Sequence, residues 1–407
     1  MPKQQLGLGG AVVIGLASML GAGVFVVFAT AYTYAADYIF LAIGLAALVA
    51  GLNSWAIYQL ARQVDRPGGV YAYSRNYLNP HFSFLSGFAF VFGKIASIAA
   101  IALVFQKYVF PNLAFWPSVL AIAALTTINI LGINRTAGVA AVISAVTVTF
   151  FIAIIIWSLL VPASETQTIV DFVNPRPFQP IIMAAGVIFF AFAGYARVAT
   201  LGNEVRDAKH NIPKAIVISL SAVLVIYLAL AFTLLRNLGG SLMDTKTPVA
   251  TLTEAVTGNT WITPLVAAVA SLGSMLALLA GVSRTAATMA EDRELPKVFL
   301  ARNRFGSPWL AEVIIAVGAI VLVSLGEIVW VIGFSSFSVL FYYAVGHLSA
   351  FAQPQTERVM PKWLNVIGVV LCVTLAVSFG WETFAISLGI LSLAWLARAL
   401  WNRLASR

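Results

Sequence analysis

Cysteine and charged residues are both scarce in this chain of 407 residues. The single cysteine, Cys372, lies inside an apolar run, which excludes an internal disulfide framework and a metal site built from several cysteines. Only 10% of the residues are charged and 61% are hydrophobic, which excludes a soluble domain of ordinary composition. The sequence also lacks a phosphate-binding loop, a cluster of metal ligands and a nucleophile motif, so neither an enzyme nor a bound cofactor or metal is indicated.

Long apolar runs are what the sequence has instead. One helical crossing of a membrane needs about 20 apolar residues. Only Gly326 and Glu327 separate the ninth and tenth runs, and the separation of the last two runs at Gly380 to Glu382 is equally short. The first run has no cleavage site after a short apolar core, so we expect it to be retained as a helix. The runs predict an all-α integral membrane protein with twelve transmembrane helices, at about 7–31, 38–62, 83–109, 117–133, 138–161, 179–200, 214–236, 262–288, 309–325, 328–351, 364–379 and 382–401.

Basic residues are distributed unevenly around these helices. With a cytoplasmic amino terminus, 18 of the 24 lysine and arginine residues fall on the cytoplasmic side and four on the opposite side. This bias follows the positive-inside rule, so the net charge of +9 reports topology and not a nucleic acid partner. We expect a multi-pass protein of the cell inner (plasma) membrane, surrounded by the lipid bilayer, with both termini cytoplasmic.

Small residues interrupt two of the predicted helices. The first helix carries Gly15, Gly21 and Gly23, and the sixth carries Gly194. Close helix-helix contact is one explanation for small residues in a membrane helix. Paired interruptions in corresponding helices of two halves instead indicate a transporter site between inverted repeats. At such a break, freed amides can bind a carboxylate and freed carbonyls can bind an ammonium group or a cation.

Four segments carry a resemblance to a known family: Ser18–Phe25, Tyr58–Ala61 with Arg66–Tyr73, Phe190–Tyr195 with Glu204–Ala215, and Ser283–Pro296. In this order, along nearly the whole chain, they resemble the amino acid-polyamine-organocation (APC) superfamily of permeases. The resemblance implies a LeuT-type fold within a single transmembrane domain, residues 1–407. Helices one to five, at about 7–161, would be repeated in inverted orientation as helices six to ten, at about 179–351, followed by two additional helices at about 364–401.

The resemblance also implies which residues of helix one bind substrate. The amides of Gly21, Ala22 and Gly23 would bind the carboxylate of an amino acid. The carbonyl of Met19 would lie near its amino group. The small-molecule substrate would then be held mainly by backbone groups.

Helix six would complete this site. By the same resemblance, the backbone of Ala191 and Ala193 would face the ammonium group, Gly194 would form the break and Phe190 would cover the substrate. The alternative for Phe190 and Phe192 is packing in the core or against lipid.

Three positions depart from the family pattern or stand out in it. An acidic residue that members often have after the helix-six glycine is Ala196 in this chain, and a helix-five lysine that replaces a sodium ion in several members aligns with Thr147. Lys94 lies near the middle of helix three, where a charge costs at least about 2.5 kcal/mol. We hypothesise that Lys94 faces the cavity and supplies the charge missing at Thr147, by contact with the helix-one break or in proton coupling. Snorkelling or a structural bond to a carbonyl is the alternative.

Besides Lys94 and Thr147, further candidates for coupling or gating lie in helices six and ten. Tyr195 and Arg197 follow the helix-six glycine, and Arg197 could pair with Glu204 in a gate or contact the substrate. His347 could titrate near neutral pH, but a lone membrane histidine is more often a packed hydrogen-bonding residue.

The acidic residues bear on the substrate class. None of the fifteen lies near a predicted membrane midplane, which favours a neutral amino acid unless aromatic faces such as Phe190 or Tyr195 hold a cation. A polyamine, organic cation or nucleobase carrier on the same fold is the alternative, and a sensor or channel is a more distant one. Proton and sodium coupling are both left open.

Overall fold

The computed structural model describes residues 6–64, 66, 68–131, 137–162, 178–195, 198, 205–325 and 328–405. Every named element in these residues is a helix, and one isolated bridge joins Leu6 and Val205. Most of the helices form from the long apolar runs, because a backbone in lipid must satisfy its hydrogen bonds internally. The α-helices are α1 (Leu8–Met19), α2 (Val27–Ala35), α3 (Ile39–Ala61), α4 (Val70–Tyr77), α5 (Pro80–Val109), α6 (Trp116–Ile130), α7 (Ala137–Leu160), α8 (Phe178–Phe192), α10 (Ala208–Leu238), α11 (Pro248–Thr257), α12 (Ile262–Glu291), α13 (Trp309–Leu325), α14 (Ile328–Ala352), α15 (Lys362–Val377) and α16 (Trp381–Ala405).

A helix lies at each of the twelve predicted positions. Seven helical segments of the described residues are long and apolar enough to cross a membrane, and α1, α6, α8, α13 and α15 are shorter apolar helices. The separation of the last two helices is confirmed, since α15 ends at Val377, Gly380 has a φ of +91° and α16 begins at Trp381. Likewise α13 ends at Leu325 and α14 begins at Ile328, although the predicted separating residues lie outside the described part of the chain.

Two helices begin a few residues before their approximate predicted bounds. Helix α5 begins at Pro80 and not near residue 83, because the Asn79 side chain accepts hydrogen bonds from the amides of His81 (2.9 Å) and Phe82 (3.1 Å) and caps the helix. Helix α10 begins before Pro213, because the Asp207 carbonyl accepts the amides of two following residues. The short helices α4 and α11 were also not predicted.

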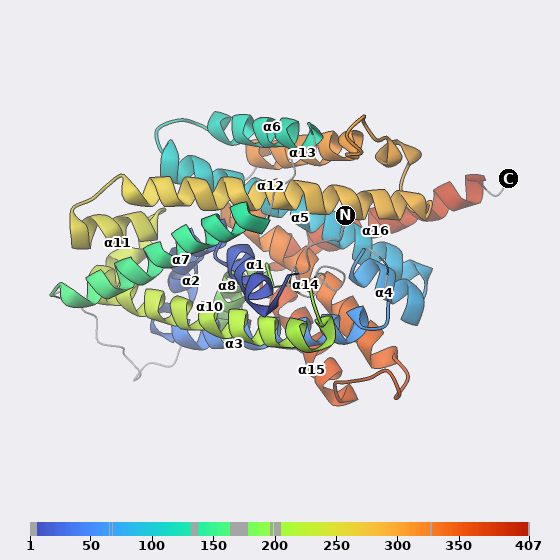
Figure 1. Cartoon of the computed structure of the whole chain (residues 1–407), viewed down its shortest axis with the longest axis horizontal. Coiled ribbons are helices and arrows are strands. Elements are labelled where there is room, and N and C mark those ends of the chain that lie inside the picture. The colour runs from blue at the N-terminus through green and yellow to red at the C-terminus, as the bar shows by residue number, and fades with distance from the viewer. Residues whose placement is uncertain are drawn as a thin grey trace. The chain divides into compact units, whose positions relative to one another are not determined.

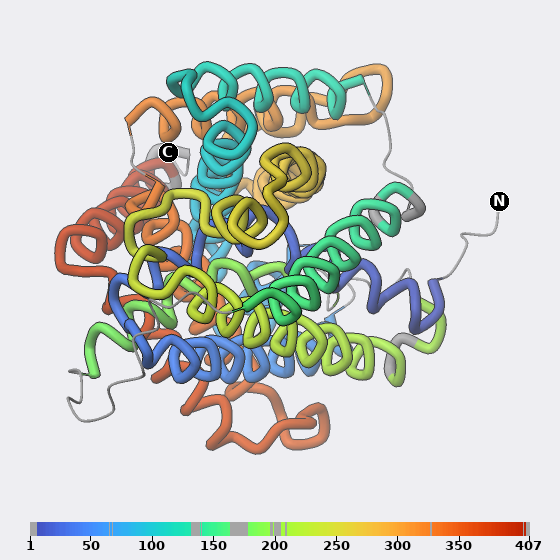
Figure 2. Tube along the Cα trace, turned by 90° about the vertical axis from the view of Figure 1, so that its left-hand side faces the viewer, coloured from blue at the N-terminus to red at the C-terminus, as the bar shows by residue number. Residues whose placement is uncertain are grey.

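The chain forms two compact units. The first comprises residues 1–51, 100–121 and 135–275. In it α1 packs against α7 and α10, α2 packs against α8, and α7 and α10 lie side by side (Figures 1 and 2). A Cβ at Gly15 would lie 2.7 Å from Ser219 Oγ of α10, so this glycine serves the close contact of α1 with α10.

The second unit comprises residues 52–99, 122–134 and 276–407. Helix α14 packs against α4, α15 and α16 in this unit (Figure 1). His347 of α14 is fully buried, with its ring nitrogens 2.9 Å from Asn53 Oδ1 and 3.1 Å from Asn365 Oδ1. These contacts agree with the structural alternative for His347, a packed hydrogen-bonding residue.

Candidate functional site

The predicted interruption of helix one is confirmed. Helix α1 ends at Met19, Gly21 is extended (φ −77°, ψ −155°), and a short 3₁₀ helix, η1 (Ala22–Phe25), precedes α2. The first amides of a helix and the last carbonyls of a helix have no partner within it. The break therefore places amide donors of η1 close in sequence to carbonyl acceptors of α1.

Helix six also stops inside its predicted range. Helix α8 ends at Phe192, and a turn follows in which the amide of Ala193 bonds to the Phe190 carbonyl (3.4 Å) and that of Tyr195 to the Phe192 carbonyl (3.2 Å). Tyr195 is fully buried, and its ring lies edge-on to Phe189 with centroids 6.4 Å apart. Three residues of the sequence prediction, Ala196, Arg197 and Glu204, lie outside the described residues.

The two interrupted helices meet in the first unit. A Cβ placed on Gly23 would lie 2.9 Å from Ala191 Cα and 3.3 Å from Phe190 Cδ1. A Cβ on Gly194 would overlap the carbonyl oxygen of Ser18. Only glycine lets these backbones approach so closely. The structure thus brings together the helix-one and helix-six residues that the sequence proposed.

Tyr227 of α10 lies at the meeting point and was not among the predicted site residues. Its hydroxyl is 2.8 Å from the Met19 carbonyl oxygen and 3.2 Å from that of Ala191. The side chain is fully buried, and its ring contacts Phe28 and Phe192, with centroids 5.7 and 4.8 Å apart. Buried tyrosine hydroxyls usually find a hydrogen-bond partner, so a tyrosine within an apolar helix was a usable signal.

The aromatic candidates divide between two roles. Phe192 has no exposed surface and packs on Tyr227, in agreement with the core alternative. Phe190 is 9% exposed and its ring edge faces Gly23, next to the helix-one break. Of the two phenylalanines, Phe190 is therefore the one beside the predicted site.

Residues around the helix-one break are closely packed. Ala22 is buried, and a Cβ on Gly21 would overlap Ser274 Oγ of α12. The Phe25 ring packs on Tyr108 and Phe151, and the Tyr108 hydroxyl donates to the Phe25 carbonyl. Phe25, the last residue of η1, is therefore packed between rings of α5 and α7.

Helix five is α7, and it carries the coupling or gating candidate Thr147. Thr147 is buried in α7 and its hydroxyl donates to the Ile143 carbonyl of its own helix (2.8 Å). Ser144, one turn earlier, instead reaches the Val13 carbonyl of α1 at 3.4 Å. Thr147 therefore shows no hydrogen bond to α1.

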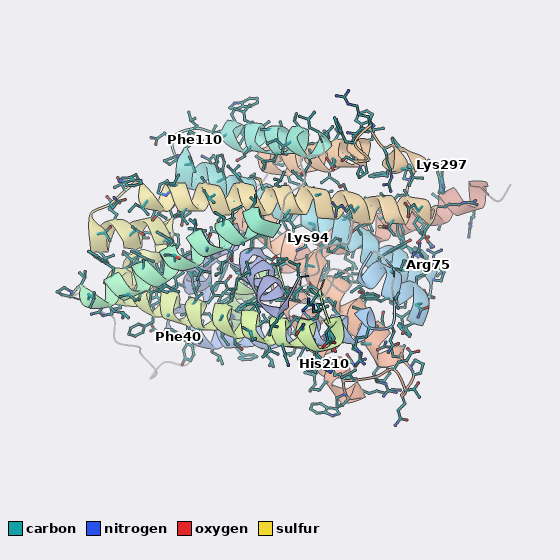
Figure 3. The ribbon with its side chains drawn as sticks, viewed as in Figure 1. Phe40, Arg75, Lys94, Phe110, His210 and Lys297 are labelled. Carbon is teal, nitrogen blue, oxygen red and sulfur yellow. The ribbon has the colours of Figure 1, made fainter. Side chains whose placement is uncertain are left out.

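Lys94 belongs to the second unit, at the middle of α5 (Figure 3). It is 8% exposed, and no ion pair or hydrogen bond of Lys94 is found within the described part of the chain. A buried lysine without a carboxylate is costly in a membrane. The predicted contact of Lys94 with the helix-one break stays a prediction. Lys94 belongs to the second unit and the break to the first, and the structure describes each unit by itself.

Charged residues gather where the second and fourth family segments meet, in the second unit. Arg66 pairs with Asp292, the Tyr71 hydroxyl donates to Asp292 (2.6 Å), and Arg75 pairs with Glu294 (3.2 Å; Figure 3 labels Arg75). Burial raises the pKa of the Asp292 carboxyl, but the hydrogen bonds from Tyr71 and Arg66 outweigh it, so the pKa lies below the ordinary value of 3.8. The pairs tie α4 to the residues after α12.

No cluster of three or more histidine, cysteine, aspartate or glutamate residues that could hold a metal is found in the described ranges. Backbone amides and carbonyls of α1, η1 and α8 lie close together. These groups suit hydrogen bonding to a small ligand that carries one positive and one negative group.

Comparison with known proteins agrees with this architecture. A family model described as amino acid permease matches residues 6–393. An uncharacterized transporter of Mycobacterium tuberculosis (strain H37Rv) is 38% identical over 395 residues, which cover 96% of this chain and 89% of that protein. The low-affinity putrescine importer PlaP of Escherichia coli (strain K12) is 25% identical, over 84% of this chain and 80% of the importer. Cationic amino acid transporter 7, chloroplastic, of Arabidopsis thaliana is 23% identical, over 86% of this chain and 65% of that protein.

The match covers nearly the whole chain, and the relatives are named as transporters. Together with the apolar helices they make this a multi-pass membrane protein and a transporter. The chain therefore belongs to the amino acid permease family, within the amino acid-polyamine-organocation superfamily.

Proposed function

We propose that this protein is a secondary active transporter that carries a neutral amino acid across the plasma membrane by alternating access. Twelve crossings, with helices one to five related to helices six to ten by inverted repetition, would place both termini in the cytoplasm. The two interrupted helices and their partners would rock against the remaining helices as the site opens to either side.

One observation carries the proposal, namely the convergence of the α1, η1 and α8 ends. The carbonyls of Met19 and Ala191 both lie within 3.2 Å of one hydroxyl group, so the two oxygens are close to each other. The amides of Gly21, Ala22 and Gly23 begin or precede η1 on the other side of the break. Carbonyl ends favour an ammonium group and amide ends favour a carboxylate. An α-amino acid carries both on one carbon.

We infer that the side chain of the substrate is neutral because acidic residues are missing from the described helices around the break. Helices α1, α2, α7, α8 and α10 contain no aspartate or glutamate. A cationic side chain or a polyamine at depth in the membrane requires a compensating negative group. Two relatives are named as a cationic amino acid transporter and a putrescine importer, which makes a cationic substrate the second candidate.

Ligand-induced stabilisation of the purified protein tests the proposal. A ligand that binds only the folded state raises stability by about 2.7 kcal/mol at a concentration of 100 times Kd. We expect a shift of the melting temperature with a few related neutral amino acids among the twenty, and none with putrescine, spermidine or nucleobases. A shift with arginine, lysine or putrescine alone would replace the neutral substrate by a cationic one. A shift with a nucleobase alone would overturn the carboxylate role of residues 21–23.

Uptake into proteoliposomes then tests the transport mechanism. Imposed proton and sodium gradients are applied separately, with the amino acid that gave the largest shift. Accumulation driven by one of the gradients is the expected result and identifies the coupling ion. Equilibration without accumulation under either gradient would contradict secondary active transport and favour a passive carrier or a channel.

A further inference from the structure

The hydroxyl of Tyr227 lies between two carbonyl oxygens at the ends of different helices. Met19 is the last residue of α1, and Ala191 lies in the last turn of α8. Carbonyls at the end of a helix carry a partial negative charge, so two such groups at close range repel each other. A hydroxyl has a single hydrogen and donates to one acceptor at a time. The distances of 2.8 Å to Met19 and 3.2 Å to Ala191 indicate that the first carbonyl is the main acceptor.

The ring of Tyr227 is fixed independently of its hydroxyl. Phe28 of α2 meets it edge-on at an interplanar angle of 88°, and Phe192 of α8 packs on it at 60°. Tyr227 has no exposed surface, so water does not replace the hydroxyl as a donor in this conformation. Removal of the oxygen alone would therefore leave the packing in place and free the two carbonyls from their common partner.

We propose that Tyr227 is a positioning residue of the substrate site, which holds the carbonyl ends of α1 and α8 together and orients them toward the ammonium group of the ligand. The inference rests on the proposed function for the ammonium group. An ammonium group has three N–H donors, and the Met19 and Ala191 carbonyls held by Tyr227 supply acceptors for two of them. The hydroxyl keeps its own hydrogen on one of the carbonyls, because each carbonyl oxygen can accept twice.

A comparison of Tyr227→Phe with Tyr108→Phe tests the role. Tyr108 is a matched control, because it is also buried in the first unit and its hydroxyl also donates to a backbone carbonyl of the helix-one region, that of Phe25. Dissociation constants are measured for the amino acid that most stabilises the wild type, for the carboxylic acid that lacks its amino group, and for putrescine. Monodisperse size-exclusion profiles establish that each variant is folded.

The expected result is selective for the amino group. Tyr227→Phe weakens binding of the amino acid by about tenfold or more, the scale of one lost buried hydrogen bond, and changes binding of the des-amino acid by less than about twofold. Tyr108→Phe changes neither by more than about twofold. Equal weakening of both ligands by Tyr227→Phe, or no weakening of either, would overturn the inference.

Failure of the proposed function gives a different pattern. If the wild type binds putrescine and no amino acid, the proposed substrate is wrong. The inference about Tyr227 still stands in that case if Tyr227→Phe weakens putrescine binding about tenfold. It falls if putrescine binding is unchanged. A measurement without ligand covers the remaining case, in which no probe binds. Backbone amide hydrogen exchange should then accelerate about tenfold in Tyr227→Phe, both in the peptide covering residues 12–20 and in the peptide covering residues 186–195. In Tyr108→Phe the two peptides should not both accelerate. Unchanged exchange in both peptides of Tyr227→Phe would overturn the inference.

Discussion

Substitution of Gly23 by alanine tests the contact between the two interrupted helices most directly. The added Cβ would lie 2.9 Å from Ala191 Cα and 3.2 Å from Ala191 Cβ. Carbon atoms pack best at about 3.5–4.0 Å, so η1 and α8 must separate by roughly 0.6 Å or more. The nearest atom belongs to the backbone of Ala191, and rotation of a side chain therefore cannot relieve the overlap.

The cost of this overlap sets the expected effect. Overpacking of a close contact costs about 1–3 kcal/mol. If that cost falls on the arrangement that binds substrate, affinity drops about 5- to 150-fold. The assay is the dissociation constant of the best amino acid ligand for Gly23→Ala, with the melting temperature measured on the same sample.

Gly44→Ala is the matched control for this experiment. Gly44 lies in α3 of the same unit, and an added Cβ there meets no atom within 4 Å. Alanine in place of an unobstructed helix glycine stabilises by about 0.5–1 kcal/mol, so stability should be equal or higher and affinity unchanged. Gly23→Ala with the melting temperature and affinity of the wild type would refute the close approach of η1 to α8 and, with it, the geometry of the proposed site.

Three other substitutions have defined outcomes. Gly21→Ala should lose less substrate affinity than Gly23→Ala, because the obstructing atom at Gly21 is the terminal Oγ of Ser274. The double variant with Ser274→Ala should restore any lost affinity. A loss that persists in the double variant would place the obstruction elsewhere. Asp292 has a lowered pKa in the folded protein, so its contribution to stability is present above the ordinary pKa of 3.8 and disappears as the pH falls through the lower folded pKa. The melting temperature of Asp292→Asn should therefore fall less between about pH 5 and pH 3 than that of the wild type. Parallel falls of the two melting temperatures would exclude the effect. Lys94→Met should reduce uptake at least about tenfold, which corresponds to a coupling free energy of about 1.4 kcal/mol, or flatten the pH dependence of uptake. Lys94→Arg should retain part of the uptake. Wild-type affinity and a wild-type pH profile in Lys94→Met would remove the coupling hypothesis.

Helix positions and the helix-one break were predictable because they depend on local properties. Apolar runs of sufficient length form helices in lipid, and glycines at 21 and 23 mark a weak point wherever the helix packs. The beginning of α5 was missed because it depends on the Asn79 cap, and hydropathy does not detect a polar cap outside the apolar run. The short helix α4 was missed for a similar reason, since its sequence is only weakly apolar and its first amide, at Val70, bonds to the Tyr342 hydroxyl of α14.

The candidate site was predictable in part. Its backbone groups, from Met19 to Gly23 and from Phe190 to Gly194, follow from the family segments, and the structure places them together. A role of Thr147 in coupling or gating stays a prediction, and its hydroxyl donates to the preceding turn of its own helix.

The sequence by itself determined that this chain is a helical membrane protein, which family it resembles and where its first helix is interrupted, since composition, hydropathy and glycine placement act over a few turns of chain. Only the tertiary structure decided which groups meet there. Tyr227 reaches the Met19 carbonyl across 208 positions of sequence, and Asp292 joins Tyr71 across 221. No period in the sequence encodes such pairs, because they depend on how helices pack and on which buried donors must find an acceptor when water is excluded.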